Sequence, residues 1–124
     1  MDKKFTCPCC GYETLPGPLG CEDICKICFW QDDLGDYITA NRPVGPNRVS
    51  LIEAQKNFIK FGASDKRILS SVRKPTSEDK KDPEWRMVDL SVDVEFLKLY
   101  DHWKKWPDDT TKLYYWKQKL QKTK

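Results

Sequence analysis

Six cysteines lie between residues 7 and 28, and none occurs in the rest of the chain. Two residues separate Cys7 from Cys10, two separate Cys25 from Cys28, and fourteen lie between the two pairs. Each short spacing turns the chain tightly enough to direct two sulfurs at one point, and the intervening loop brings the pairs together. The spacing predicts one structural Zn²⁺ bound by the thiolates of Cys7, Cys10, Cys25 and Cys28.

The other residues of this region affect how well each turn forms. Gly11 follows the first pair and suits a turn that needs a positive φ just past its second ligand. Phe29 follows the second pair, so the second turn is expected to be less ideal. Cys9 and Cys21 are surplus to a four-ligand site. Cys9 could replace a neighbouring ligand, but Cys-x-Cys makes a poorer chelating turn, so we expect it to be a free or packed thiol.

The alternative for the six cysteines is a disulfide framework, which requires an oxidising compartment. The first residues, Met-Asp-Lys-Lys-Phe-Thr-Cys, contain no apolar stretch of the kind that a secretory signal needs. We therefore expect a cytoplasmic protein whose thiols stay reduced, and zinc rather than disulfides.

Three segments resemble one known family: CPCCGYETL, then ICKICFWQDD, then Ser50-Leu51 with Ala54 and Asn57-Phe58. They are similar to the bacterial cysteine-rich CPCC family over about residues 5–75. Gln31 stands where that family more usually has an acidic residue, and Cys21 is an addition. The family has no settled enzymatic activity. The resemblance implies the zinc site, and some small proteins of this kind look like immunity partners of bacterial toxins.

Length and composition indicate a single soluble domain. The chain has 124 residues, of which 39% are hydrophobic and five are tryptophan, enough to fill one core. Charged residues make up 33%, and no apolar run approaches the ~20 residues that span a bilayer. We expect one domain over 1–124, with a zinc-ribbon-like module at 1–40, a linker at 41–49 and a mainly helical remainder at 50–124.

The fold class predicted from these patterns is α+β, a small N-terminal zinc ribbon packed with three to four short α-helices. Short strands are expected around 5–7, 13–15 and 29–30. Ser50 and Glu53 form a capping-box signature ahead of an apolar set at helical spacing, and Gly62 closes it, which predicts a helix at about 50–61. Asp65 can cap a short second helix that runs through Val72.

The C-terminal part gives a mixed pattern. Apolar residues alternate with polar ones over 88–95, and from Val92 they also recur at helical spacing. We predict a strand near 86–90 and a helix over about 92–106 capped by Ser91. After Pro107, a stripe of Leu113, Trp116 and Leu120 predicts a final helix.

Charge is unevenly distributed along the chain. Residues 1–46 carry four basic and seven acidic side chains, whereas residues 47–124 carry eighteen and twelve. A zinc held by four thiolates adds a local charge of about −2. We therefore expect the ribbon to repel nucleic acid and to suit a protein partner through its acidic side chains, which are Glu22, Asp23, Asp32, Asp33 and Asp36.

The sequence contains no catalytic motif that we recognise. Its one histidine, His102, falls within a predicted helix, where a packing or surface role is the commoner one. We expect no enzymatic activity. Two binding functions remain: stoichiometric binding of another protein, of which an immunity or antitoxin-type partner of a toxin is one form, and nucleic-acid binding through the lysines of the C-terminal helix. Steep salt dependence would indicate the second.

Overall fold

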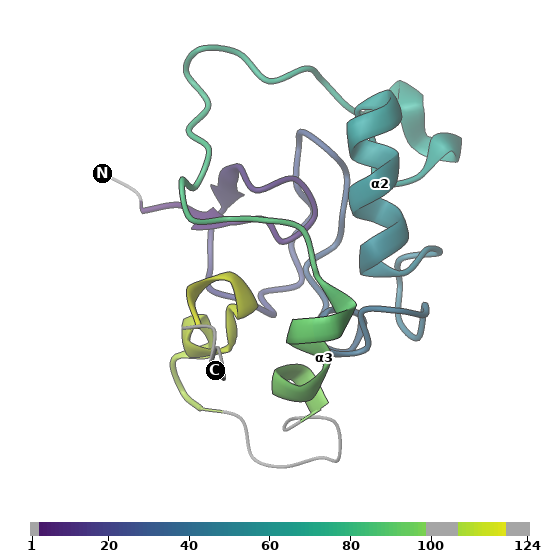
Figure 1. Ribbon diagram of the computed structural model, residues 1–124. Coiled ribbons are helices and arrows are strands. Elements are labelled where there is room, and N and C mark those ends of the chain that lie inside the picture. The colour runs from purple at the N-terminus through teal and green to yellow at the C-terminus, as the bar shows by residue number, and fades with distance from the viewer. Residues whose placement is uncertain (1–2, 99–106, 119–124) are drawn as a thin grey trace.

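The computed structural model describes residues 3–98 and 107–118 (Figure 1). Its α-helices and strands are β1 (Phe5–Thr6), β2 (Glu13–Leu15), α1 (Leu34–Ile38), α2 (Leu51–Phe61) and α3 (Leu90–Lys98). Its 3₁₀ turns are η1 (Lys66–Ser71), η2 (Thr110–Leu113) and η3 (Tyr115–Lys117). The described residues contain a small sheet and several short helices, which confirms the predicted α+β class.

The sheet is one antiparallel pair. Phe5 of β1 faces Leu15 of β2, and a register shift follows within β1. The predicted third strand at 29–30 is wrong. Instead, the segment around Lys81 runs beside the turn that precedes β2, with an isolated bridge to Tyr12 and a 2.8 Å hydrogen bond from the Glu13 N–H to the Lys80 carbonyl.

Helix α2 follows the prediction closely. The Ser50 hydroxyl accepts the N–H of Glu53, and Gly62 ends the helix with a φ of +87°. Its inner face buries Leu51, Ala54 and Gln55. Asp65 caps the next element as predicted, but that element is the 3₁₀ turn η1 and ends at Ser71.

Helix α1 was not predicted from the sequence. It is only five residues long, and the Asp33 carboxylate accepts the Asp36 N–H at its start. Leu34, Tyr37 and Ile38 are buried on it. The expected linker at 41–49 is held against this helix, because the Asp36 carboxylate accepts N–H groups from its residues 44, 45 and 47.

The C-terminal predictions need correction. The predicted strand near 86–90 is absent, and α3 begins at Leu90, where Asp89 rather than Ser91 provides the cap by accepting the Ser91 N–H. The predicted final helix is two 3₁₀ turns, separated at Tyr114 by an extended ψ of 115°. The rest of the predicted 92–106 helix, His102 and Leu120 lie outside the described residues.

The core joins the cysteine region to both later parts of the chain. Trp30, Tyr37, Leu51 and Tyr115 are all fully buried in it together with the cysteines of both pairs. Figure 1 shows α2 along one side of the N-terminal segment. Helix α3 and the 3₁₀ turns η2 and η3 lie below the N-terminal segment in this view. Among the described residues, no helix combines the length and the apolar character that crossing a membrane requires.

Candidate metal centre

The four predicted ligands meet in one place. The sulfurs of Cys7, Cys10, Cys25 and Cys28 all lie within 4.8 Å of one another, and all four residues are 0% exposed. The Cys7 and Cys28 sulfurs are 3.6 Å apart, and those of Cys10 and Cys25 are 3.8 Å apart. A tetrahedral site with Zn–S bonds of about 2.3 Å has edges of about 3.8 Å. The donor set and its spacing therefore fit one tetrahedral metal ion.

The two cysteine pairs sit on turns of the same backbone design. In the first turn the Gly11 N–H donates to the Cys7 carbonyl over 2.8 Å, and in the second the Phe29 N–H donates to the Cys25 carbonyl over 2.8 Å. Gly11 has a φ of +82° and Phe29 a φ of +70°. Phe29 therefore occupies the position that glycine holds in the first turn, at a conformational cost of about 1–2 kcal/mol. The second turn forms despite its unfavourable residue.

Packing explains why the first turn requires glycine. A Cβ at Gly11 would lie 2.7 Å from the ring of Trp85, so a side chain there would displace the indole. The Trp85 indole N–H in turn donates to the Pro8 carbonyl over 2.9 Å. Glycine thus permits both the positive φ and the close approach of Trp85, which lies 77 positions after Pro8 in the sequence.

The Cys25 sulfur receives hydrogen bonds from outside the four-cysteine group. The Thr14 hydroxyl on β2 donates to the Cys25 sulfur over 3.1 Å, and the Ile27 N–H donates to it over 3.4 Å. Hydrogen bonds from the other three thiols, with a further one from Thr14, hold the pKa of Cys25 far below its ordinary value. The hydrogen bonds from Thr14 and Ile27 therefore favour the thiolate form of Cys25.

At the other three thiols the effect of burial outweighs that of the hydrogen bonds. Burial raises the pKa of Cys7, Cys10 and Cys28 well above the ordinary value. Four buried thiolates without a cation would be strongly disfavoured. A bound divalent ion offsets this cost and displaces the protons, so its binding couples to the fold of the region.

The two surplus cysteines lie outside this group. Cys9 is 0% exposed and belongs to the core, and Cys21 is only partly buried. Burial raises the pKa of Cys21, and its backbone N–H donates to the Asp32 carboxylate over 3.1 Å. The sulfurs that lie together are thus the four that the spacing selects, and Cys9 and Cys21 are not among them.

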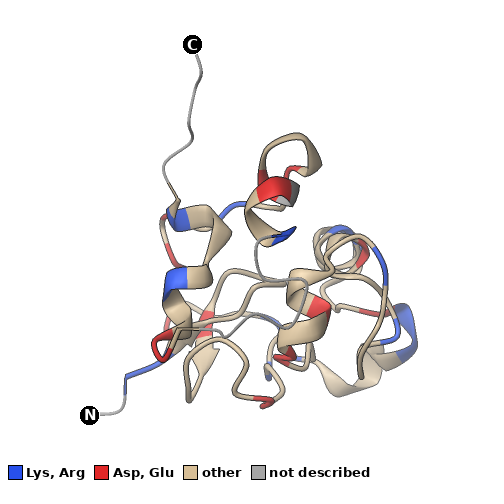
Figure 2. Ribbon diagram, turned by 90° about the horizontal axis from the view of Figure 1, so that it is seen from below, with Lys and Arg blue, Asp and Glu red and all other residues tan. Residues whose placement is uncertain are grey.

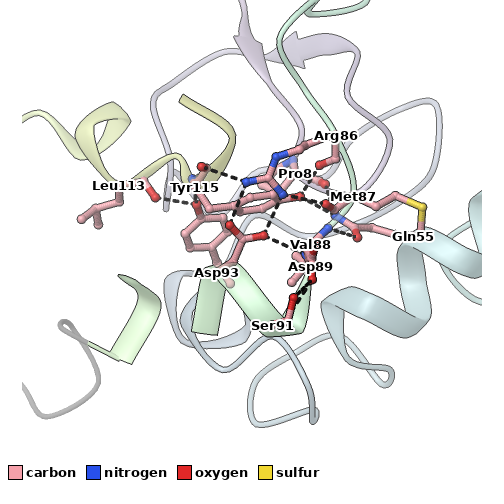
Figure 3. A network of polar contacts seen from close by, with 11 residues as sticks. Pro8, Gln55, Arg86, Met87, Val88, Asp89, Ser91, Asp93, Leu113 and Tyr115 are labelled. Carbon is pink, nitrogen blue, oxygen red and sulfur yellow. Dashed lines mark hydrogen bonds and ion pairs between the residues drawn. The ribbon is translucent and has the colours of Figure 1, made fainter. Parts of the chain in front are cut away.

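A buried polar network holds the first turn from behind (Figure 3). Gln55 on α2 donates its amide N–H groups to the Pro8 carbonyl over 3.0 Å and to the Tyr115 hydroxyl over 2.9 Å. Its amide oxygen accepts the Val88 N–H over 3.0 Å, so every polar function of the Gln55 side chain has a partner. Segments from three distant parts of the chain thereby meet behind one metal-ligand turn.

An ion pair closes the far side of the network. Arg86 donates two hydrogen bonds of 2.8 Å to the carboxylate of Asp93, which is 3% exposed. The guanidinium also lies over the Tyr115 ring, with its carbon 5.1 Å from the ring centroid. The hydrogen bond with Asp93 raises the pKa of Arg86. This pair fixes α3 against η3 behind the cysteine turn.

The five acidic residues predicted as a partner surface have different environments. Glu22 and Asp23 are exposed, and Asp33 is partly exposed while it caps α1. Asp32 and Asp36 are each 0% exposed. Asp32 accepts the N–H groups of Gly20 and Cys21, and Asp36 holds the loop at 44–47, so neither side chain can touch a partner directly.

Sequence reasoning missed the residues that support the cysteine turns. Thr14, Gln55, Trp85 and Tyr115 have no motif of their own, and only the folded chain brings them to the site. A buried threonine beside a cysteine pair, or a glutamine on the apolar face of α2, would have been the available signals.

These features define a small α+β protein with a buried tetra-cysteine group that can hold a metal ion. A family model described as cysteine-rich CPCC matches residues 5–79, and the chain belongs to this family. The match confirms the resemblance drawn from the three sequence segments. No curated protein and no solved structure gave a significant match to the chain. Trp85, Arg86 and Tyr115, which support the first cysteine turn, lie beyond the matched range.

Proposed function

We propose that the cysteine group binds a single structural Zn²⁺. The observation that carries this proposal is the spacing of the sulfurs, with edges of 3.6 Å and 3.8 Å in a fully buried four-thiolate set. Zinc favours such closed tetrahedral thiolate sites, in which no ligand position is left for water. The ion would link the two turns at the centre of the core to which all four cysteines belong.

Metal analysis of protein purified without added zinc tests this proposal. We expect one zinc per chain in the native protein and in the Cys21→Ser variant, and loss of zinc in the Cys25→Ser variant. A folded native protein with no zinc, or with disulfides among its cysteines, would contradict the proposal. A variant pattern in which Cys21 is required and Cys25 is not would show that the ligand assignment is wrong.

We further propose that the protein acts in the cytoplasm by stoichiometric binding of another protein, without catalysis, as an immunity or antitoxin-type partner of a toxin. Such a protein needs a rigid surface rather than a reactive centre. The zinc centre and the network behind it supply rigidity, and Glu22 and Asp23 offer exposed carboxylates on the second cysteine region. Opposite charge on a toxin would speed association and discriminate among partners.

Paired expression tests this second proposal. The reading frame next to this one in the source genome is expressed with and without this protein, and cell growth is followed. We expect the neighbour to inhibit growth alone and to be neutralised in the presence of this protein. A neighbour that is harmless alone, or equally inhibitory in both cases, would exclude the immunity role.

A further inference from the structure

Lysines from well-separated parts of the chain gather around one hollow of the surface. The hollow has a volume of about 580 Å³ and is lined by Lys3, Lys4, Lys26 and Lys80, together with acidic residues and Arg73. These lysines come from the start of the chain, the second cysteine turn and the segment that pairs with β2. Their convergence results from folding and is not visible in the sequence order.

A second hollow of about 370 Å³ continues this surface. It shares Lys3, Lys4 and Glu13 with the first, so the two hollows adjoin at these residues. Figure 2 shows this lysine-bearing N-terminal segment beside the 3₁₀ turns η2 and η3, which carry lysines of their own. The two hollows together form a groove that could receive an extended chain. We call it the lysine groove.

Three of the five carboxylates that line the groove already have partners within the protein. Asp79 is paired with Arg73 at 2.8 Å, and Glu84 is paired with Lys117 at 2.7 Å. Asp82 is 5% exposed and accepts hydrogen bonds from the Thr6 hydroxyl and the Trp116 indole. Asp79 and Glu84 are therefore neutralised by their ion-pair partners, whereas Asp82 keeps its charge but is too deeply buried to contact a ligand.

The remaining charges of the groove are predominantly positive. Within the described part of the chain, Lys3, Lys4, Lys26 and Lys80 form no ion pair with any acidic side chain. The groove carries two further carboxylates, Glu13 and Glu78, that are likewise without an ion pair there. Four lysines against these two glutamates and the buried Asp82 leave one excess positive charge, and an acidic ligand can complement the exposed lysines.

The mixed charge decides between two kinds of acidic ligand. A nucleic-acid backbone carries its phosphates at a fixed spacing, so it cannot turn them away from Glu13 and Glu78 while it contacts the lysines. A peptide segment can place carboxylates against the lysines and a neutral or basic side chain against each glutamate.

We propose that the lysine groove binds an acidic, extended segment of a protein partner. This inference rests on the protein-binding function proposed above and specifies the partner surface. It differs from the sequence-based expectation, in which the acidic side of the ribbon alone would contact a basic protein. Charge pairs at such an exposed surface mainly increase the association rate and fix the register of the bound segment.

The test is an NMR titration of the zinc-loaded full chain with hexaglutamate, and with hexaglutamine and a short oligothymidylate as comparison ligands. We expect saturable shifts of the backbone amides of Lys3, Lys4, Lys26 and Lys80 with hexaglutamate, and none with hexaglutamine. The double variant Lys26→Gln/Lys80→Gln should bind hexaglutamate about three- to tenfold more weakly, because each exposed charge pair contributes modestly.

The matched control is Lys56→Gln/Lys60→Gln, which removes the same charge from the exposed side of α2. It should bind hexaglutamate as the native protein does, within about twofold. Equal weakening in both variants, or shifts away from the groove, would overturn the proposal. Tighter binding of oligothymidylate with the same lysine dependence would also overturn it, in favour of a nucleic-acid surface. A groove that fails this test while paired expression still shows neutralisation would refute only the groove.

Discussion

Removal of the Thr14 hydroxyl should weaken metal binding without unfolding the protein. Thr14 is 9% exposed on β2, and its hydroxyl donates to the Cys25 sulfur over 3.1 Å. Thr14→Val keeps the shape of the side chain but replaces the hydroxyl with a methyl group. The Cys25 thiolate then loses its only side-chain donor from outside the four-cysteine group within the described part of the chain.

A hydrogen bond to a charged group contributes about 1.5–3 kcal/mol. Loss of such an outer contact typically lowers metal affinity about 10–100-fold. We therefore expect Thr14→Val to release zinc to a competing chelator at a concentration about 10–100-fold lower than the native protein requires. Thr14→Ser, which retains the hydroxyl, should stay within about threefold of the native affinity.

Thr6→Val is the matched control, because Thr6 lies on β1 and donates its buried hydroxyl to Asp82 over 2.7 Å instead of to a ligand sulfur. It should lower the free energy of unfolding while leaving zinc competition of the folded protein unchanged. The visible spectrum of the cobalt-substituted protein gives a second measure, which should change in Thr14→Val only. Native zinc affinity in Thr14→Val, or equal loss in Thr6→Val, would refute the role assigned to this hydroxyl.

Two further perturbations test the scaffold. Gly11→Ala should destabilise the fold by about 2–4 kcal/mol in denaturant unfolding, because it adds a clash with Trp85 to the strain of a positive φ. Gly62 also has a positive φ, of +87°, but an added Cβ there would meet no atom within 4 Å. Gly62→Ala should therefore lower the free energy of unfolding by only about 1 kcal/mol. Burial raises the pKa of Asp32 from 3.8 to about 6. The folded protein therefore binds the Asp32 proton more tightly than the unfolded chain does. Protonation of Asp32 stabilises the fold fully below about pH 4, and this contribution is lost as the pH rises through about 6. The stability of the native protein relative to Asp32→Asn should fall by about 3 kcal/mol across that range, and a flat difference would contradict the burial argument.

The parts of the structure that depend on neighbouring residues were predictable. The four cysteines that come together are those chosen by spacing, because a two-residue separation directs both sulfurs to one side of a turn. Helix α2 begins at Leu51 and ends at Phe61, where Ser50 and Gly62 supply local start and stop signals. Both features are specified by a few residues in sequence and need no distant contact.

The parts that depend on distant contacts were not predictable. The apolar stripe after Pro107 indicated a helix, yet the Tyr37 hydroxyl accepts the Tyr115 N–H over 2.8 Å and donates to the Leu113 carbonyl. These bonds replace those of a continuous helix, so the segment forms two 3₁₀ turns with Tyr115 fully buried. A residue 78 positions earlier decides the conformation, and no window of local sequence contains that information.

The surface charge of residues 1–46 also could not be predicted from the sequence, and this affects where a partner can bind. A count along the sequence assigns all acidic residues of 1–46 to one surface, but folding removes Asp32 and Asp36 into backbone-binding roles and leaves them 0% exposed. It also brings Lys80 and Arg73, from the basic part of the chain, beside Lys26. A carboxylate that accepts two or more backbone N–H groups acts as a structural element of its loop and contributes little to the outer field. The partner surface of this protein therefore has to be sought among side chains that have no internal ion pairs, and within the described residues the lysine groove brings four such lysines together.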